Sequence, residues 1–152
     1  MKRPLAIGAL IILGLACFLA ISSRAAEPTA DDHDTLSNKV TDLMSLVSAR
    51  KVDDLLQRVG ATADPNRANY DSLRSSLTDL PNFAGKYVDS EIVGYKNLGS
   101  RYEVVYVMAN FQKLPVLFEF DFYKTNNDWQ PLKLRTATNF QTVVDALPME
   151  KP

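Results

Sequence analysis

The spacing of apolar residues along this chain changes once, near residue 85. Before that point, apolar side chains recur at intervals of three and four, at Leu36, Val40, Leu43, Met44 and Val47, then Val52, Leu55, Leu56 and Val59, then Tyr70, Leu73, Leu77 and Leu80. This spacing predicts three amphipathic helices. We expect Asp34 or Thr35 to cap the first helix, Gly60 to end the second and Pro81 to end the third.

After residue 85, apolar and polar side chains alternate, which is typical of β-strands. The alternation predicts four strands, over residues 87–95, 101–111, 114–124 and 129–138. The polar segments between them are so short that they can join only antiparallel neighbours. Helices followed by a run of strands indicate a single α+β domain, with the N-terminal helices packed on a four-stranded antiparallel sheet.

The segment from Val116 to Thr136 predicts a hairpin with a defined register. A three-residue loop over 126–128 pairs Phe122 with Leu132, Phe120 with Leu134, Asp121 with Lys133 and Glu119 with Arg135. A two-residue loop would place Asp121 opposite Leu132, so the hydrophobic pattern favours the longer loop. Cross-strand pairing explains the four charges without any ligand.

The segment from Val104 to Ala109 is apolar in both phases of a strand, and such strands are usually covered on both faces. The helices can cover one face. We therefore expect a second copy or another protein to cover the other face, and we assign Val105 and Val107 to that contact surface.

A ligand pocket is the alternative role for the apolar strand residues. Aromatic and soft side chains on a curved sheet can line a cavity, although they more often form core. The candidate pocket residues are Tyr102, Tyr106, Met108, Phe118 and Phe120. The two tyrosines stand out because a buried hydroxyl group needs a hydrogen-bond partner.

The first 26 residues have the layout of a secretory signal peptide. Lys2 and Arg3 precede an apolar run of 17 residues, Leu5 to Ile21, and a small-residue zone that favours cleavage after Ala25. We divide the chain into a signal peptide (1–25), a linker (26–34), the α+β domain (35–147) and a tail (148–152). The expected location is periplasmic or secreted. The alternatives are an uncleaved segment that anchors the domain to the inner membrane and lipidation of Cys17.

Charge and residue usage exclude several kinds of site. Removing residues 1–25 leaves 14 bases against 18 acids, a net charge of −4, which does not favour nucleic acid. Cys17, the only cysteine, lies in the apolar run, so the domain has no disulfide. His33 is the only histidine, which excludes the common catalytic triads. It lies among acids in the predicted linker, where we expect no metal site. We expect no cofactor.

The chain resembles the nuclear-transport-factor-2-like superfamily of cystatin-like α+β domains. The resemblance lies in the layout over residues 34–147: a helical pair joined through VSARKVDDLLQRVG (residues 47–60), a further helix, and long strands ending in NNDWQPLKLRT (126–136). It implies a cone-like domain whose curved sheet wraps the helices, often a homodimer and often without catalytic residues. We therefore expect an exported, non-enzymatic domain that self-associates or binds a partner protein. The alternative is a small apolar ligand, or isomerase or hydratase chemistry, inside the cone.

Overall fold

The computed structural model describes residues 29–60, 67–126 and 128–139, and it confirms the α+β class. Three helices precede four strands. Their bounds are α1 (Ala30–Ser48), α2 (Val52–Arg58), α3 (Arg67–Phe83), β1 (Tyr87–Asn97), β2 (Tyr102–Phe111), β3 (Pro115–Thr125) and β4 (Asp128–Ala137). The predicted C-terminal tail and the signal peptide lie outside the described residues.

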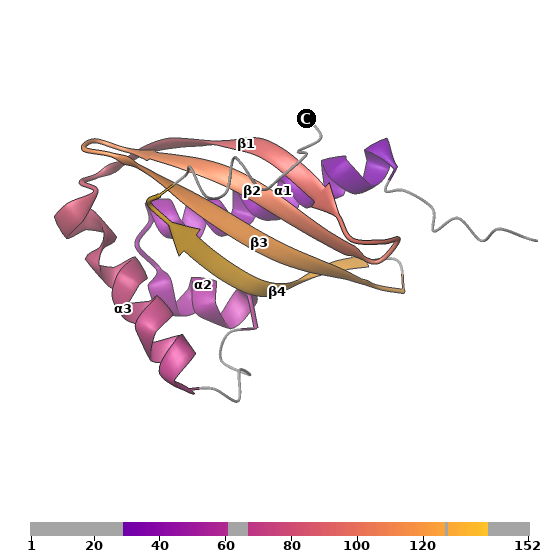
Figure 1. Ribbon diagram of the computed structural model, residues 1–152, viewed down its shortest axis with the longest axis horizontal. Coiled ribbons are helices and arrows are strands. Elements are labelled where there is room, and N and C mark those ends of the chain that lie inside the picture. The colour runs from indigo at the N-terminus through magenta and orange to yellow at the C-terminus, as the bar shows by residue number, and fades with distance from the viewer. Residues whose placement is uncertain (1–28, 61–66, 127, 140–152) are drawn as a thin grey trace, which may run out of the picture.

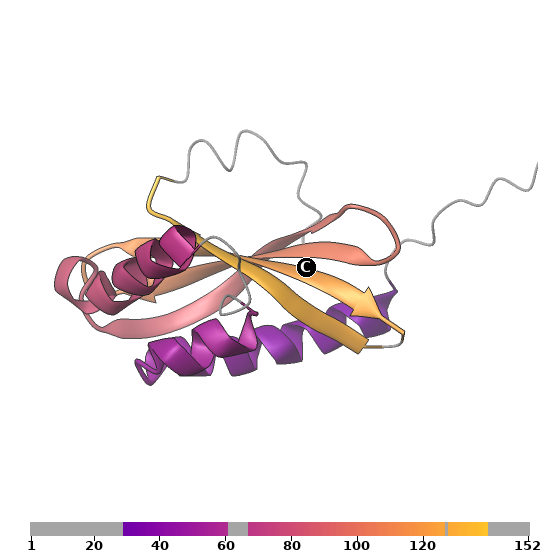
Figure 2. The same ribbon diagram turned by 90° about the horizontal axis from the view of Figure 1, so that it is seen from below.

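The strands form an antiparallel meander in the order β1-β2-β3-β4. The sheet is curved and does not close into a barrel, and α1 and α2 run along one of its faces (Figures 1 and 2). Among the described helices, none is both long enough and apolar enough to cross a membrane.

The first helix begins within the segment that the sequence assigned to the linker. Thr29, not Asp34 or Thr35, is its cap: the Thr29 hydroxyl accepts a hydrogen bond from the Asp32 amide, and the Asp32 carboxylate accepts one from the Thr29 amide. This reciprocal arrangement satisfies two amides that a helix start leaves without intrahelical partners. The acidic run is therefore the first turn of α1, where carboxylates suit the helix dipole.

The other two helix ends show one confirmed prediction and one wrong one. Gly60 has a φ of 67° directly after Val59, the residue that caps α2, as expected. Pro81 does not end α3, which continues to Phe83. A proline this close to a helix end removes one hydrogen bond only, and the Ala84 amide still bonds to the Leu80 carbonyl at 2.8 Å.

The hydrophobic core fills the space between the helices and the sheet. Its largest side chains come from β3 and β4, and its other members come from all three helices and from β1 and β2. Phe118, Phe120, Phe122 and Trp129 are all at most 1% exposed. The centre of the domain is thus packed with aromatic rings, which leaves the cavities at its side.

The β3–β4 hairpin combines the two registers that the sequence treated as alternatives. Glu119 faces Arg135 and Phe120 faces Leu134, as predicted. Beyond Asp121 the register shifts by one residue, so that Phe122 faces Pro131 and the connection shortens to two residues. The predicted pairing of Phe122 with Leu132 is therefore wrong. A β-bulge takes up the extra residue and leaves Leu132 49% exposed.

Candidate ligand-binding cavity

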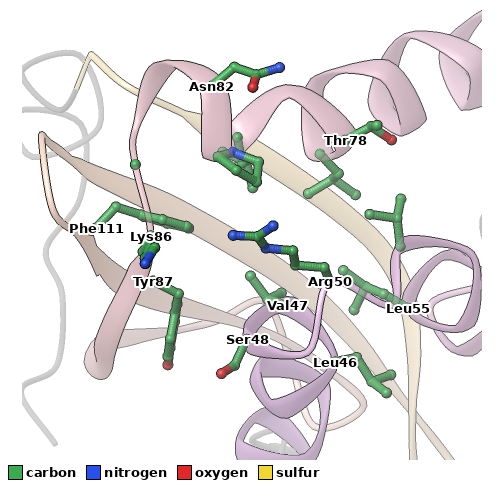
Figure 3. Close-up of a pocket in the computed structure, with 15 residues that line it drawn as sticks. Leu46, Val47, Ser48, Arg50, Leu55, Thr78, Asn82, Lys86, Tyr87 and Phe111 are labelled. Atoms are coloured by element: carbon green, nitrogen blue, oxygen red, sulfur yellow. The ribbon is translucent and has the colours of Figure 1, made fainter.

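An open cavity of about 510 Å³ lies at the side of the domain. We call it the lateral cavity. Its walls come from the end of α1, the start of α2, the last turns of α3 and the adjoining ends of β1 and β2 (Figure 3). Most of its described lining is apolar, with contributions from Leu46, Val47, Val52, Leu55, Leu77, Leu80, Pro81 and Phe111. Its volume falls within the range of known small-molecule sites, roughly 300–1,000 Å³.

The charged groups of the lateral cavity are all positive. Arg50 and Lys86 are its charged lining residues, and no described lining residue is an acid. Figure 3 shows the Arg50 guanidinium extending from the end of α1 into the space that the lining residues enclose. The cavity therefore presents a strong multiple hydrogen-bond donor next to apolar walls.

The helix end holds Arg50 in an uncommon backbone conformation. Its φ is 59°, in the left-handed region that normally favours glycine. The Arg50 amide donates to the Val47 carbonyl at 3.0 Å, and the Lys51 amide donates to the Leu46 carbonyl at 2.9 Å. This pair of bonds is a Schellman motif, in which the arginine occupies the usual glycine position. The side chain extends from this turn into the cavity (Figure 3).

A second, shallower hollow of about 330 Å³ adjoins the lateral cavity. It lies between α1 and β1, and both hollows are lined by Ser48 and Tyr87. Tyr87 is fixed between them, because its hydroxyl donates to the Ser90 hydroxyl at 2.7 Å and its ring packs edge-on against Phe111.

The pocket residues expected from the sequence do not line either hollow, and they lie on two different faces of the sheet. Phe118 and Phe120 point toward the helices and belong to the core. Tyr102, Tyr106 and Met108 belong to an apolar cluster on the opposite, outward face. Alternation along β2 and β3 separates these two groups.

Val105 and Val107 point toward the helices. They are 0% and 1% exposed in the core. The sequence assigned them to a contact surface because β2 is apolar in both phases and its orientation was open. The outward phase is instead Tyr102, Val104, Tyr106 and Met108, together with Leu117 and Val93 from the neighbouring strands.

The outward tyrosines adjoin a charged network. Tyr102 donates a hydrogen bond of 2.8 Å to Asp121, and Arg135 bonds to both Asp121 and Glu119. Burial and the hydrogen bond to Asp121 raise the pKa of Tyr102 to about 12. Burial and the nearby Glu119 raise the pKa of Tyr106 to about 12. Both hydroxyls therefore stay protonated at neutral pH, which does not suit a general base.

A second polar cluster connects the first turn of α1 to all four strands of the sheet. Asp32 accepts hydrogen bonds from Lys124 at 2.5 Å and from Trp129 at 2.9 Å. His33 stacks on Tyr95 with ring centroids 4.2 Å apart, and its Nε2 lies 3.8 Å from Glu103, which is 1% exposed. These groups have partners within the domain, so the cluster has a structural role. Among the described residues, no group of three or more His, Cys, Asp or Glu side chains could hold a metal ion.

Sequence reasoning missed the lateral cavity and its arginine. The motif VSARKVDD marks the turn between the first two helices, and it was interpreted only as a helix end whose bases suit the dipole. The available signal was the missing glycine. A tight helix–helix turn usually has glycine after the helix cap, and here Arg50 stands at that position.

Comparisons with known proteins add no family to this geometry. No protein-family model matches the chain, and neither the curated proteins nor the solved structures contain a significant match to it.

Proposed function

We propose that this domain is a non-enzymatic binding protein whose lateral cavity takes a small, largely apolar ligand. The single observation that carries the proposal is the cavity: about 510 Å³, with apolar side chains from three helices and from β2 in its walls. Known ligand sites span roughly 300–1,000 Å³. Burial of apolar ligand surface contributes about 25 cal/mol per Å², so such walls can hold a small molecule without any catalytic group.

The position of the ionisable groups supports binding over catalysis. The described lining of the lateral cavity offers Arg50, Lys86 and Tyr87 as ionisable side chains. General acid–base catalysis needs a proton donor or acceptor within hydrogen-bond reach of the reacting group. Tyr102 and Tyr106, the two tyrosines among the pocket residues expected from the sequence, lie on the outward face of the sheet.

Association through the outward face of the sheet stays a prediction with less support. Val104, Tyr106 and Leu117, the central residues of the outward cluster, are only 3–4% exposed in a single chain. A second copy or a partner protein would bury little more of them, and stable interfaces need roughly 800 Å² from each partner.

The proposed setting is outside the cytoplasm. The basic, apolar and small-residue zones of residues 1–26 support export, followed by release into the periplasm or the medium, or retention as an inner-membrane anchor. Membership of the nuclear-transport-factor-2-like superfamily is part of the same proposal. Its support is the order of three helices before a four-stranded antiparallel meander.

Ligand binding can be tested by thermal denaturation of the domain with a panel of small apolar molecules. A ligand that binds only the folded state raises the midpoint temperature, by an amount that grows with its concentration. Val52→Trp should abolish this shift, because Val52 lines the cavity and is half-buried.

The matched control is Leu98→Trp, which adds a similar side chain at a 57% exposed position outside the cavity lining. The control variant should keep the full shift. A shift that persists unchanged in Val52→Trp, or a panel without any effect on the wild-type domain, would contradict the proposal.

A further inference from the structure

We infer that the ligand is an amphipathic anion, an alkyl chain that ends in a carboxylate, and that Arg50 and Lys86 bind the carboxylate. This inference rests on the proposed binding function and specifies its ligand class. It comes from three features of the lateral cavity: the sign of its charges, the lack of partners for its cations among the described residues, and the fixed backbone conformation at Arg50.

The charge of the cavity is opposite to that of the domain. Acids exceed bases by four after residue 25, yet the described lining has two cations and no carboxylate. A concave surface of one sign attracts a ligand of the other sign, and low-dielectric walls strengthen the attraction. The field in this cavity therefore selects for a negative group.

Among the residues that the structure describes, Arg50 and Lys86 have no partner for their side-chain cations, whereas several other cations of the domain have one. Lys124 pairs with Asp32, Arg74 with Asp53, Lys39 with Asp128 and Arg135 with Glu119. Lys113, near the cavity, donates to the Asn82 carbonyl at 3.0 Å. Within the described parts of the chain, no hydrogen bond or ion pair joins the side chain of Arg50 or Lys86 to another group. Their donors remain available to a ligand.

The conformation of Arg50 favours a carboxylate in particular. A guanidinium group presents parallel N–H donors that match the two oxygens of a carboxylate. The Schellman motif fixes the backbone from which this group extends, so less conformational freedom is lost when the ligand binds. A left-handed φ at a residue other than glycine is strained, and retained strain of this kind concentrates at functional sites.

The apolar walls suit the rest of such a molecule. Leu46, Val52, Leu55 and Leu77 line the same cavity as Arg50. An alkyl chain lying against them would leave water while its head group stays at the guanidinium. Each methylene group that becomes buried should tighten binding by about fourfold.

Calorimetric titration of the mature domain with decanoate, decanol and decylammonium tests this inference, because these molecules share one chain and differ in the charge of the head group. Decanoate should bind about 10- to 100-fold more tightly than decanol. Decylammonium should bind more weakly than decanol. The preference for decanoate should shrink as ionic strength rises, because salt screens an open site.

Three variants assign the preference to the cavity. Arg50→Gln should remove most of the preference for decanoate over decanol, with Lys86 retaining the remainder, while leaving the affinity for decanol within about twofold. Arg50→Lys should keep part of the preference for decanoate, because the positive charge stays. It should lose the rest, because an ammonium group lacks the parallel N–H donors of a guanidinium group. Arg58→Gln removes the same charge from an exposed position of α2 outside the lining and should change neither affinity.

The results separate the inference from the proposed function. Equal affinity of the wild-type domain for decanoate and decanol would overturn the anionic ligand class and keep apolar binding. An unchanged preference in Arg50→Gln would overturn the assignment of the carboxylate to Arg50. Failure of all three molecules to bind would count against both the anionic ligand class and the proposed binding function.

Discussion

The indole Nε1 of Trp129 donates a hydrogen bond of 2.9 Å to the carboxylate of Asp32, which lies 97 residues earlier in the chain. The same carboxylate forms an ion pair with Lys124, whose ammonium also lies 5.4 Å from the centre of the Trp129 ring. One acid in the first turn of α1 therefore fastens that helix to both strands of the β3–β4 hairpin.

Loss of this acid should destabilise the domain. We expect Asp32→Ala to lower the free energy of unfolding by about 1–3 kcal/mol, because it leaves the Trp129 and Lys124 donors without their acceptor. Urea denaturation monitored by tryptophan fluorescence measures the change. Asp32→Asn is the matched control: it keeps an oxygen for Trp129 and should lose less. Equal stability of Asp32→Ala and the wild type would contradict this assignment.

Acid should weaken the same connection in a defined range. Although burial acts to raise the pKa of Asp32, hydrogen bonds from Lys124 and Trp129 lower it to about 2. The ordinary value is about 3.9. The stabilisation is therefore complete above about pH 4 and is lost as the pH falls toward about 2. The difference in unfolding free energy between wild type and Asp32→Asn should shrink over that interval, and a constant difference would rule the mechanism out.

Alkali should act on the outward face of the sheet. The pKa values of Tyr102 and Tyr106 are raised to about 12, whereas unfolded tyrosines ionise near about 10. The protonated hydroxyls stabilise the fold fully below about pH 10, and this contribution disappears as the pH rises to about 12. Phenolate absorbance should show ionisation near pH 12 that decreases in Tyr102→Phe and in Tyr106→Phe. A titration curve that neither substitution changes would show that other tyrosines produce it.

The left-handed backbone conformation of Arg50, which places its side chain in the lateral cavity, should lower the stability of the domain. Arg50→Gly relieves the left-handed conformation at a φ of 59°, and we expect it to raise the unfolding free energy by up to about 1 kcal/mol. The same variant should lose most of the preference for decanoate. Asn126→Gly, at a φ of 52° in the β3–β4 connection, should also be stabilising or neutral but should leave binding unchanged. A less stable Arg50→Gly domain would mean that the arginine side chain holds the helix end.

The sheet could be predicted closely because its pattern is local. Phe118, Phe120 and Phe122 alternate with charged residues, and that alternation alone fixes which side of β3 faces the core. The bulge at Leu132 could not be predicted, because it depends on how Trp129 and Leu134 are both buried in the core after the chain turns. Two candidate registers were treated as exclusive, whereas the structure uses one near the turn and the other farther along.

The polar cluster at the start of α1 was missed for a different reason. Asp32 and His33 belong to an acidic run that resembles a linker when its neighbours in sequence are the only guide. Their partners Tyr95, Glu103 and Trp129 lie more than 60 residues away and meet them only in the folded domain. The lateral cavity is equally non-local, since three helices and two strand ends form its walls.

The register shifts of the sheet all lie in the ladders that join its two edge strands, β1 and β4, to their neighbours. Register shifts interrupt the β1–β2 ladder at two places and the β3–β4 ladder at one, whereas the central β2–β3 ladder is regular over all nine of its paired positions. An open sheet has two strands with unpaired backbone groups, and long straight edges recruit strands from other molecules into aggregates. Here both edge strands are broken by bulges, and Pro131 lies on one of them. The domain can therefore keep an unclosed sheet, with the cavities that openness permits, and still resist polymerisation through its edges.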